Sequence, residues 1–246
     1  MKQLKQLLFL LLIPLGGIVN AQSPAVVKEP SGSLASVATK AKAKDAQILD
    51  ARTSEEFAQN HLAGAININP ASLTLEKDIA RLSKDKPTFV YSIANGRSVT
   101  LAKKLSEQGF REVIVLPGGI ANWIGSGYPI VNNAKKGVSL SPAQFETLTA
   151  SSDFVLVDFG SKYCGACKKL IPVLDTLERK SGFAAKIVRI EAYDQTELLK
   201  ALKINQLPTL VLYHGKKQVW KKAGQSTAAE IEAVVAQHQT ELAKGN

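Results

Sequence analysis

The sequence predicts an α/β protein of two domains, on the basis of three observations. Short apolar segments typical of strands alternate with amphipathic segments typical of helices, a pattern that favours parallel sheets. The 246 residues are enough for two modest hydrophobic cores. A polar stretch without apolar periodicity, residues 132–138, separates the two halves and is interpreted as a linker.

The start of the chain has the three parts of a secretory signal peptide. Lys2 and Lys5 precede an apolar core at residues 7–13, and small residues ending at Ala21 form the expected cleavage site. The apolar run is shorter than the about 20 residues that cross a bilayer, so we expect no stable membrane insertion. Residues 1–21 are therefore predicted to be removed and residues 22–32 to be flexible. The mature protein is expected to be exported, soluble and periplasmic.

The composition is that of an ordinary globular protein, with 45% hydrophobic and 21% charged residues. The net charge of +10 is distributed along the chain, and no dense basic tract with interleaved aromatic residues is present. We therefore expect no nucleic-acid partner. Three histidines without finger-like spacing and two cysteines also give no complete metal site, so no metal and no cofactor are expected.

The first domain, residues 33–131, has the alternating pattern of a parallel sheet. Strands are predicted at 46–52, near 65–68, at 87–91 and at 113–116, with helices at 33–42, from Thr53 onward, at 97–108 and around Trp123. Thr53 is the expected N-cap of its helix, with Glu56 as its capping-box partner.

Several motifs in this half resemble the rhodanese family. They lie at 49–52 (LDAR), 56–57 (EF), 61–67 (HLAGAIN), 118–123 (GGIANW) and 127–130 (GYPI). The resemblance implies a sulfane-sulfur carrier cysteine at the start of the loop after the central strand, in a loop that reads roughly Cys-x-x-x-x-Arg-Ser. Here the corresponding loop begins with Ser92 and continues through Gly96 and Arg97 to Ser98.

Ser92 at the nucleophile position predicts a catalytically silent domain. A serine hydroxyl cannot carry a persulfide, and its pKa is too high for attack without a neighbouring base. Rhodanese sulfurtransferase activity is therefore not expected, and a protein-binding or structural platform is the favoured role. An anion site remains an alternative, because N–H groups before a helix start lie near Arg97 in this loop.

The second domain, residues 139–246, begins with a helix capped by Ser141, with Pro142 at its first position and Gln144 as capping-box partner. Strands are predicted at 154–159, 184–190, 207–213 and 218–223. Further helices are predicted at 168–181, 197–202 and 227–243.

Cys164 and Cys167, the only cysteines, lie between a predicted buried strand and a predicted helix. A helix start favours an anion, so the pKa of the Cys164 thiol should be lowered. Cys167 lies one turn further and should be more covered, which suits attack by one thiol and resolution by the other. Half of a zinc site and a purely structural disulfide are alternatives that fit less well, since zinc takes about four ligands and the loop is short.

The motifs of this half resemble thioredoxin. They are 157–159 (VDF), 164–168 (CGACK), 207–210 (LPTL) and Gly224. The resemblance implies that Cys164 attacks, that Cys167 resolves, and that the buried acid Asp158 takes the proton of the second cysteine. It also implies a cis Pro208 beside the disulfide, with the backbone of Leu207 pairing with an extended substrate. Tyr163 stands where the family usually has Trp, and we expect it to line the same substrate-binding site.

These observations together predict a rhodanese-like parallel-sheet domain followed by a thioredoxin-fold domain. The expected function is that of an exported thiol–disulfide oxidoreductase that uses the cysteine pair. A partner-binding scaffold with secondary redox activity and a persulfide or sulfane-sulfur reductase are the alternatives. The expected partners are protein thiol or disulfide substrates and a redox partner that recycles the cysteine pair.

Overall fold

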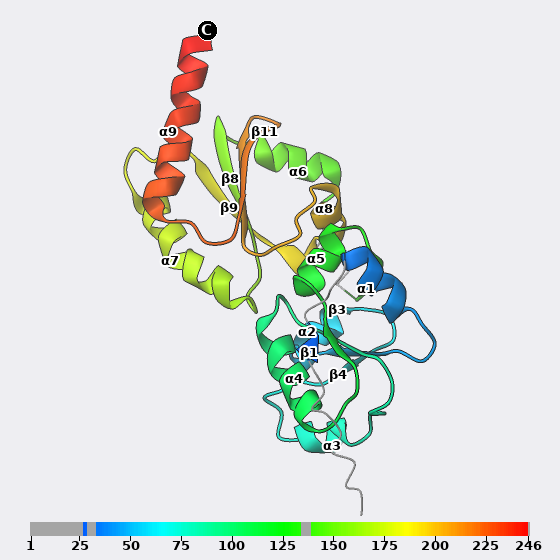
Figure 1. The fold of residues 1–246 in the computed structure, drawn as a ribbon. Coiled ribbons are helices and arrows are strands. Elements are labelled where there is room, and N and C mark those ends of the chain that lie inside the picture. Colours follow the sequence, from blue (N-terminus) through cyan, green and yellow to red (C-terminus); the bar gives the residue numbers. More distant parts are fainter. Residues whose placement is uncertain (1–26, 29–32, 134–138, 246) are drawn as a thin grey trace, which may run out of the picture.

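The computed structural model of the protein describes residues 27–28, 33–133 and 139–245, which form two α/β domains (Figure 1). The predicted signal peptide at 1–21 lies outside the described residues, as do residues 134–138 of the predicted linker and most of the segment 22–32. The α/β class predicted from the sequence is confirmed.

The first domain is built on a five-stranded, wholly parallel sheet in the order β1-β6-β5-β2-β4. Its strands are β1 Val27–Lys28, β2 Gln47–Asp50, β4 Ala65–Asn67, β5 Thr88–Tyr91 and β6 Val113–Val115. The four predicted strands are confirmed, but β1 was not predicted. Two residues are too few to show a sequence period, and β1 is recognised only by its pairing with β6.

Five helices accompany this sheet in the described residues: α1 Leu34–Ala41, α2 Ser54–Gln59, α3 Leu75–Ile79, α4 Gly96–Glu107 and α5 Gly119–Gly125. The predicted capping box at the start of α2 is confirmed. The Thr53 hydroxyl accepts from the Glu56 N–H at 3.3 Å, and the Glu56 carboxylate accepts from the Thr53 N–H at 3.0 Å. α3 was not predicted.

A two-stranded antiparallel ribbon joins β3 Asn60–His61 to β7 Val131–Asn132. Asn132, the first residue of the predicted linker, belongs to this ribbon. Its side-chain amide also donates to the hydroxyl of Thr196 at 3.0 Å. A residue expected between the domains thus bonds to both of them, which only the packed structure could reveal.

The second domain has a mixed four-stranded sheet in the order β11-β10-β8-β9. Its strands are β8 Phe154–Gly160, β9 Lys186–Glu191, β10 Thr209–His214 and β11 Lys217–Ala223. β8 pairs in parallel with β9 and antiparallel with β10, and all seven of its residues are buried. Each of these strands matches a predicted one to within two residues at most ends.

Helices cover both faces of this sheet (Figure 1). They are α6 Pro142–Thr149, α7 Gly165–Arg179, α8 Thr196–Ala201 and α9 Ala228–Gly245, with the short 3-10 helix η1 Ala192–Asp194 before α8. Side chains alternate along β8, so Leu156 packs in the cluster with residues of α7 and α9, whereas Val157 packs in the cluster with residues of α6 and α8. The predicted capping box of α6 is also confirmed.

The two domains share one continuous hydrophobic core. Ile120 and Ile124 of α5 belong to the same buried cluster as Leu199 of α8 and Ile204 after it. Domains that move independently usually meet through more polar contacts than this buried apolar cluster. The first domain therefore packs against the second on the side that carries α8.

Candidate active site around Cys164 and Cys167

The cysteine pair lies where the sequence predicts it, between the end of β8 and the start of α7. Cys164 is the N-cap of α7 and is joined to Cys167 by a disulfide, with the two Cα atoms 5.2 Å apart. The N–H of Cys167 donates to the sulfur of Cys164 at 3.2 Å. This bond points at Cys164 alone, so a thiolate there is stabilised by a backbone donor as well as by the helix start.

The burial of the pair differs from the prediction. Cys167 was expected to be more covered than Cys164, but each is 4% exposed. Cys164 is covered because the turn before β10 packs over it, with the carbonyl oxygen of Leu207 lying 3.9 Å from its sulfur. Burial therefore does not distinguish the two cysteines, whereas the N–H bond received by the Cys164 sulfur does.

Three loops meet around Cys164. The Leu207–Pro208 peptide is cis, as the resemblance implied. The carbonyl of Pro208 accepts from the Gly224 N–H at 2.8 Å, and the amide of Gln225 donates to the carbonyl of Ala166 at 2.6 Å. These bonds tie the loop after β11 to the turn before β10 and to the first turn of α7.

Tyr163 is half-buried beside this site. Its N–H donates to the hydroxyl of Ser161 at 3.3 Å, and the ammonium of Lys162 lies 4.9 Å from the centroid of its ring. A cation at this distance from an aromatic ring interacts favourably with it. These contacts hold Tyr163 next to Cys164.

Asp158 is buried within β8, as the resemblance implied. Burial raises the pKa of its carboxyl to about 6, and the positive charge of Arg189 opposes this by a smaller amount. Arg189 lies opposite Asp158 in β9, but its guanidinium bonds to Asp175 at 2.7 Å and to Glu178 at 3.0 Å. The carboxyl of Asp158 can therefore take up and release a proton near neutral pH.

Gly160, which sequence reasoning missed, leaves the space between Asp158 and Cys167 open. A Cβ on Gly160 would lie 3.5 Å from a carboxylate oxygen of Asp158 and 3.6 Å from the Cβ of Cys167. A cavity of about 210 Å³ adjoins this space, and Arg189 and Glu191 also line it. The cavity, which Asp158 and Cys167 both line, is large enough for water.

The loop of the first domain, by contrast, is filled. Ser92 is 2% exposed, and its hydroxyl donates to the carbonyl of Ala94 at 3.0 Å and lies 3.2 Å from the Ser98 hydroxyl. Its carbonyl accepts from the N–H of Ile120 at 2.9 Å. The Ser92 side chain is thus bonded within its own loop.

Arg97 lies near Gly96 at the start of α4, as predicted, but its guanidinium is already paired. Its two terminal nitrogens lie 2.6 and 2.8 Å from the two carboxylate oxygens of the buried Glu56. A bidentate pair of this kind fixes the guanidinium. The alternative of an anion site at Ser92, Gly96 and Arg97 is weakened, because Glu56 occupies the positive group that would hold the anion.

A buried charge network in the first domain was also missed by sequence reasoning. The guanidinium of Arg52 forms a salt bridge with Asp50 at 2.7 Å and bonds to the side chain and carbonyl of Asn60. It lies 5.7 Å from the ring centroid of Tyr91 and 5.9 Å from that of Tyr193, which belongs to the second domain. The sequence showed only a strand that ends in charge, with no sign of the aromatic partner about 140 residues away.

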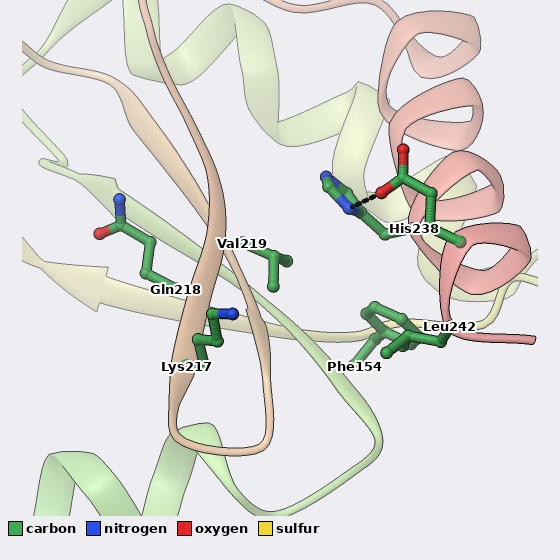
Figure 2. A pocket seen from close by; sticks show the side chains of 7 residues that line it. Phe154, Lys217, Gln218, Val219, His238 and Leu242 are labelled. Atoms are coloured by element: carbon green, nitrogen blue, oxygen red, sulfur yellow. Dashed lines mark ion pairs between the residues drawn. The ribbon is translucent and has the colours of Figure 1, made fainter. Parts of the chain in front are cut away.

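Another cavity, of about 350 Å³, lies between β11 and the end of α9 (Figure 2). Phe154, Val219 and Leu242 line it, and His238 pairs with Glu241 at 3.1 Å on its helical side. Phe154 begins β8, whereas the disulfide follows the other end of that strand, about 20 Å away at the rise of a β-strand. This cavity is therefore remote from the cysteine pair.

Within the described part of the chain, no helix is long and apolar enough to cross a membrane. The same residues contain no cluster of three or more His, Cys, Asp or Glu side chains that could hold a metal ion.

Comparison with known proteins places both halves. Residues 33–126 match the family model of the rhodanese-like domain, and residues 136–237 match that of thioredoxin. The chain is 34% identical over 82 residues to "Thiosulfate sulfurtransferase GlpE" of Coxiella burnetii, a match that covers 33% of this chain and 75% of that protein. The chain belongs to the rhodanese-like family, and a thioredoxin domain follows.

Two further relatives match one domain each. The rhodanese-like domain is 33% identical over 90 residues to "Uncharacterized protein YibN" of Escherichia coli K12, covering 36% of this chain and 62% of that protein. The chain thus spans less than two thirds of the length of that relative. The thioredoxin domain is 29% identical over 100 residues to "Thioredoxin" of Haemophilus influenzae, covering 40% of this chain and 94% of that protein. The thioredoxin domain supports thiol–disulfide oxidoreductase activity in general.

Proposed function

We propose that this protein is an exported thiol–disulfide oxidoreductase that acts on protein substrates through Cys164 and Cys167. The observation that carries this proposal is the disulfide at the start of α7, with the carbonyl of Leu207 beside Cys164. An extended substrate strand can pair with that backbone while its own sulfur reaches Cys164. A second supporting observation is the titratable Asp158, which shares the space left by Gly160 with Cys167.

The reduced pair acts in two balanced steps. The Cys164 thiolate attacks one sulfur of a substrate disulfide, which forms a mixed disulfide and releases a substrate thiolate. Cys167 then loses its proton to the Asp158 carboxylate through water in the adjoining cavity and attacks the sulfur of Cys164. The second substrate thiolate leaves, and the Cys164–Cys167 disulfide forms. A redox partner must supply two electrons and two protons to restore the thiols, or remove them if the protein works as an oxidant.

We further propose that the rhodanese-like domain transfers no sulfur and acts as a binding or structural platform. Ser92 has no sulfur atom to carry a persulfide. Its hydroxyl is buried and hydrogen-bonded to the carbonyl of Ala94 in the same loop. The pairing of Arg97 with Glu56 also removes the cation that an anionic sulfur donor would need. The shared buried cluster of α5 with Leu199 and Ile204, which precede Leu207, favours a structural role.

Export to the periplasm is the remaining part of the proposal. It rests on the charged, apolar and small-residue segments that end at Ala21. Cell fractionation with N-terminal sequencing of the mature protein tests it. We expect a periplasmic protein that begins at Gln22, and a cytoplasmic protein that keeps its first 21 residues would contradict export.

Reduction of insulin by dithiothreitol tests the redox function. The wild-type protein should accelerate the reaction, Cys164→Ser should abolish the acceleration, and Cys167→Ser should trap mixed disulfides.

A thiosulfate:cyanide sulfurtransferase assay of the wild type and of Cys164→Ser/Cys167→Ser tests the silent domain. Activity that survives the loss of both cysteines would contradict the silent-domain proposal, whereas activity that vanishes with them would move sulfur transfer to the cysteine pair.

A further inference from the structure

The first domain contacts residues 193–205 of the second, in the segment that links β9 to the turn at Leu207. The amide of Gln59 donates to the carboxylate of Asp194 at 2.6 Å, and the amide of Asn60 donates to the carbonyl of Tyr193 at 3.3 Å. Both bonds lie at the start of this segment. The segment is therefore fixed to the first domain at its beginning.

The helix α5 fixes the other end of the same segment. It has a glycine at each end, and each glycine packs directly on backbone. A Cβ on Gly119 would overlap the carbonyl of Ser92 and lie 2.7 Å from those of Ile93 and Ala94. At the other end, a Cβ on Gly125 would overlap the carbonyl group of Ile204.

Gly125 leaves no room for any side chain. Besides the overlap with Ile204, its Cβ would lie 2.7 Å from the Cα of Asn205, which is closer than the 3.0 Å that real Cβ atoms keep. All three of these atoms belong to backbone, so no side-chain rotation can relieve the contact. A methyl group at position 125 must displace residues 204–205 or α5 itself.

Residues 204–205 lie immediately before the turn that faces the disulfide. Ile204 is buried in the core that both domains share, and Leu207 follows three residues later. The Leu207 carbonyl lies 3.9 Å from the Cys164 sulfur. A shift at residue 204 is therefore passed to the atoms that would pair with a substrate, because three residues of backbone leave little freedom to absorb it.

We propose that α5 of the rhodanese-like domain positions the Leu207 turn for extended protein substrates, and that Gly125 is the positioning residue. The inference rests on the proposed redox function and gives the platform a defined task. It also gives the Ser92 loop a present role, since that loop supports α5 at Gly119. Small disulfides do not need the Leu207 backbone, so positioning affects protein substrates selectively.

The test compares Gly125→Ala with Ser126→Ala in the otherwise intact protein. Ser126 is the neighbouring, exposed residue, and its hydroxyl bonds within α5 to Asn122. Each reduced protein is mixed with insulin and, separately, with 2-hydroxyethyl disulfide, and the second-order rate constants are measured. Gly125→Ala should react about tenfold more slowly with insulin but within about twofold of wild type with the small disulfide. Ser126→Ala should match wild type with both.

Equal losses with the two disulfides, or no loss with insulin, would overturn the positioning role. Hydrogen exchange of the peptide that covers residues 202–208 gives a readout that needs no turnover. Gly125→Ala should exchange faster there than Ser126→Ala, and identical exchange would also overturn the inference. If Gly125→Ala does not fold, Gln59→Ala replaces it, because loss of the bond to Asp194 should raise exchange in the same peptide.

The outcomes also separate this inference from the proposed function. A wild-type protein inert toward both disulfides would contradict the redox function, while the exchange measurement would still decide whether α5 positions the turn. A wild-type protein that reduces insulin as fast as Gly125→Ala does would contradict the positioning role alone.

Discussion

Replacing Asp158 by asparagine tests how strongly burial opposes the charged form of this carboxyl. Asp158 is 5% exposed, and burial raises its pKa from the ordinary 3.8 to about 6. A difference of about two pKa units corresponds to about 3 kcal/mol between the charged and neutral forms. Asparagine keeps the size of the neutral acid and never ionises, so it removes this cost.

The expected pH dependence follows from proton binding. Between about pH 4 and pH 6 the folded protein holds a proton on Asp158 that the unfolded chain has lost, so stability falls as the pH rises through this range. The wild type and Asp158→Asn should therefore be almost equally stable near pH 4. As the pH rises, the wild type should lose stability relative to the variant. Above about pH 7 the free energy of unfolding of the variant should exceed that of the wild type by about 3 kcal/mol.

Urea unfolding of the oxidised proteins between pH 4 and pH 8 measures this difference. Asp153→Asn is the matched control, because Asp153 precedes the same strand and is exposed. It should change the free energy of unfolding by less than about 0.5 kcal/mol at every pH. A stability difference for Asp158→Asn that does not vary with pH, or a loss of stability at pH 8, would refute the argument. The same substitution removes the proton acceptor, so insulin reduction should slow by up to about 100-fold.

Two further predictions concern the cysteine pair and a buried ion pair. In the reduced protein, iodoacetamide should modify Cys164 before Cys167, because the N–H of Cys167, 3.2 Å from the Cys164 sulfur, stabilises a thiolate there. Peptide mass mapping after short labelling measures the order, and earlier labelling of Cys167 would contradict this reasoning. Arg97→Ala should cost about 3 kcal/mol of unfolding free energy, since it leaves Glu56 buried without its cation, whereas Arg111→Ala, which breaks an exposed pair, should cost less than about 1 kcal/mol. Equal urea midpoints for these two variants would contradict that reasoning.

The sequence alone determined what depends on neighbours along the chain. Apolar periodicity located most strands and helices, and the cap residues Thr53 and Ser141 marked two helix starts correctly. The spacing of Cys164 and Cys167, after a buried strand and before a helix, placed the disulfide at the correct junction. Each of these features is local, because hydrogen bonds of helices and caps join residues three or four apart.

The tertiary structure decided everything that depends on residues far apart. The sequence placed Arg97 near a loop for which an anion site was an alternative. The carboxylate that pairs with its guanidinium belongs to Glu56, 41 positions away. The equal burial of the two cysteines depends on Leu207, 43 positions from Cys164. Position 125 requires a glycine because the backbone of Ile204 packs directly against it. No local pattern encodes such contacts, since close packing of the finished core alone determines which distant atoms meet.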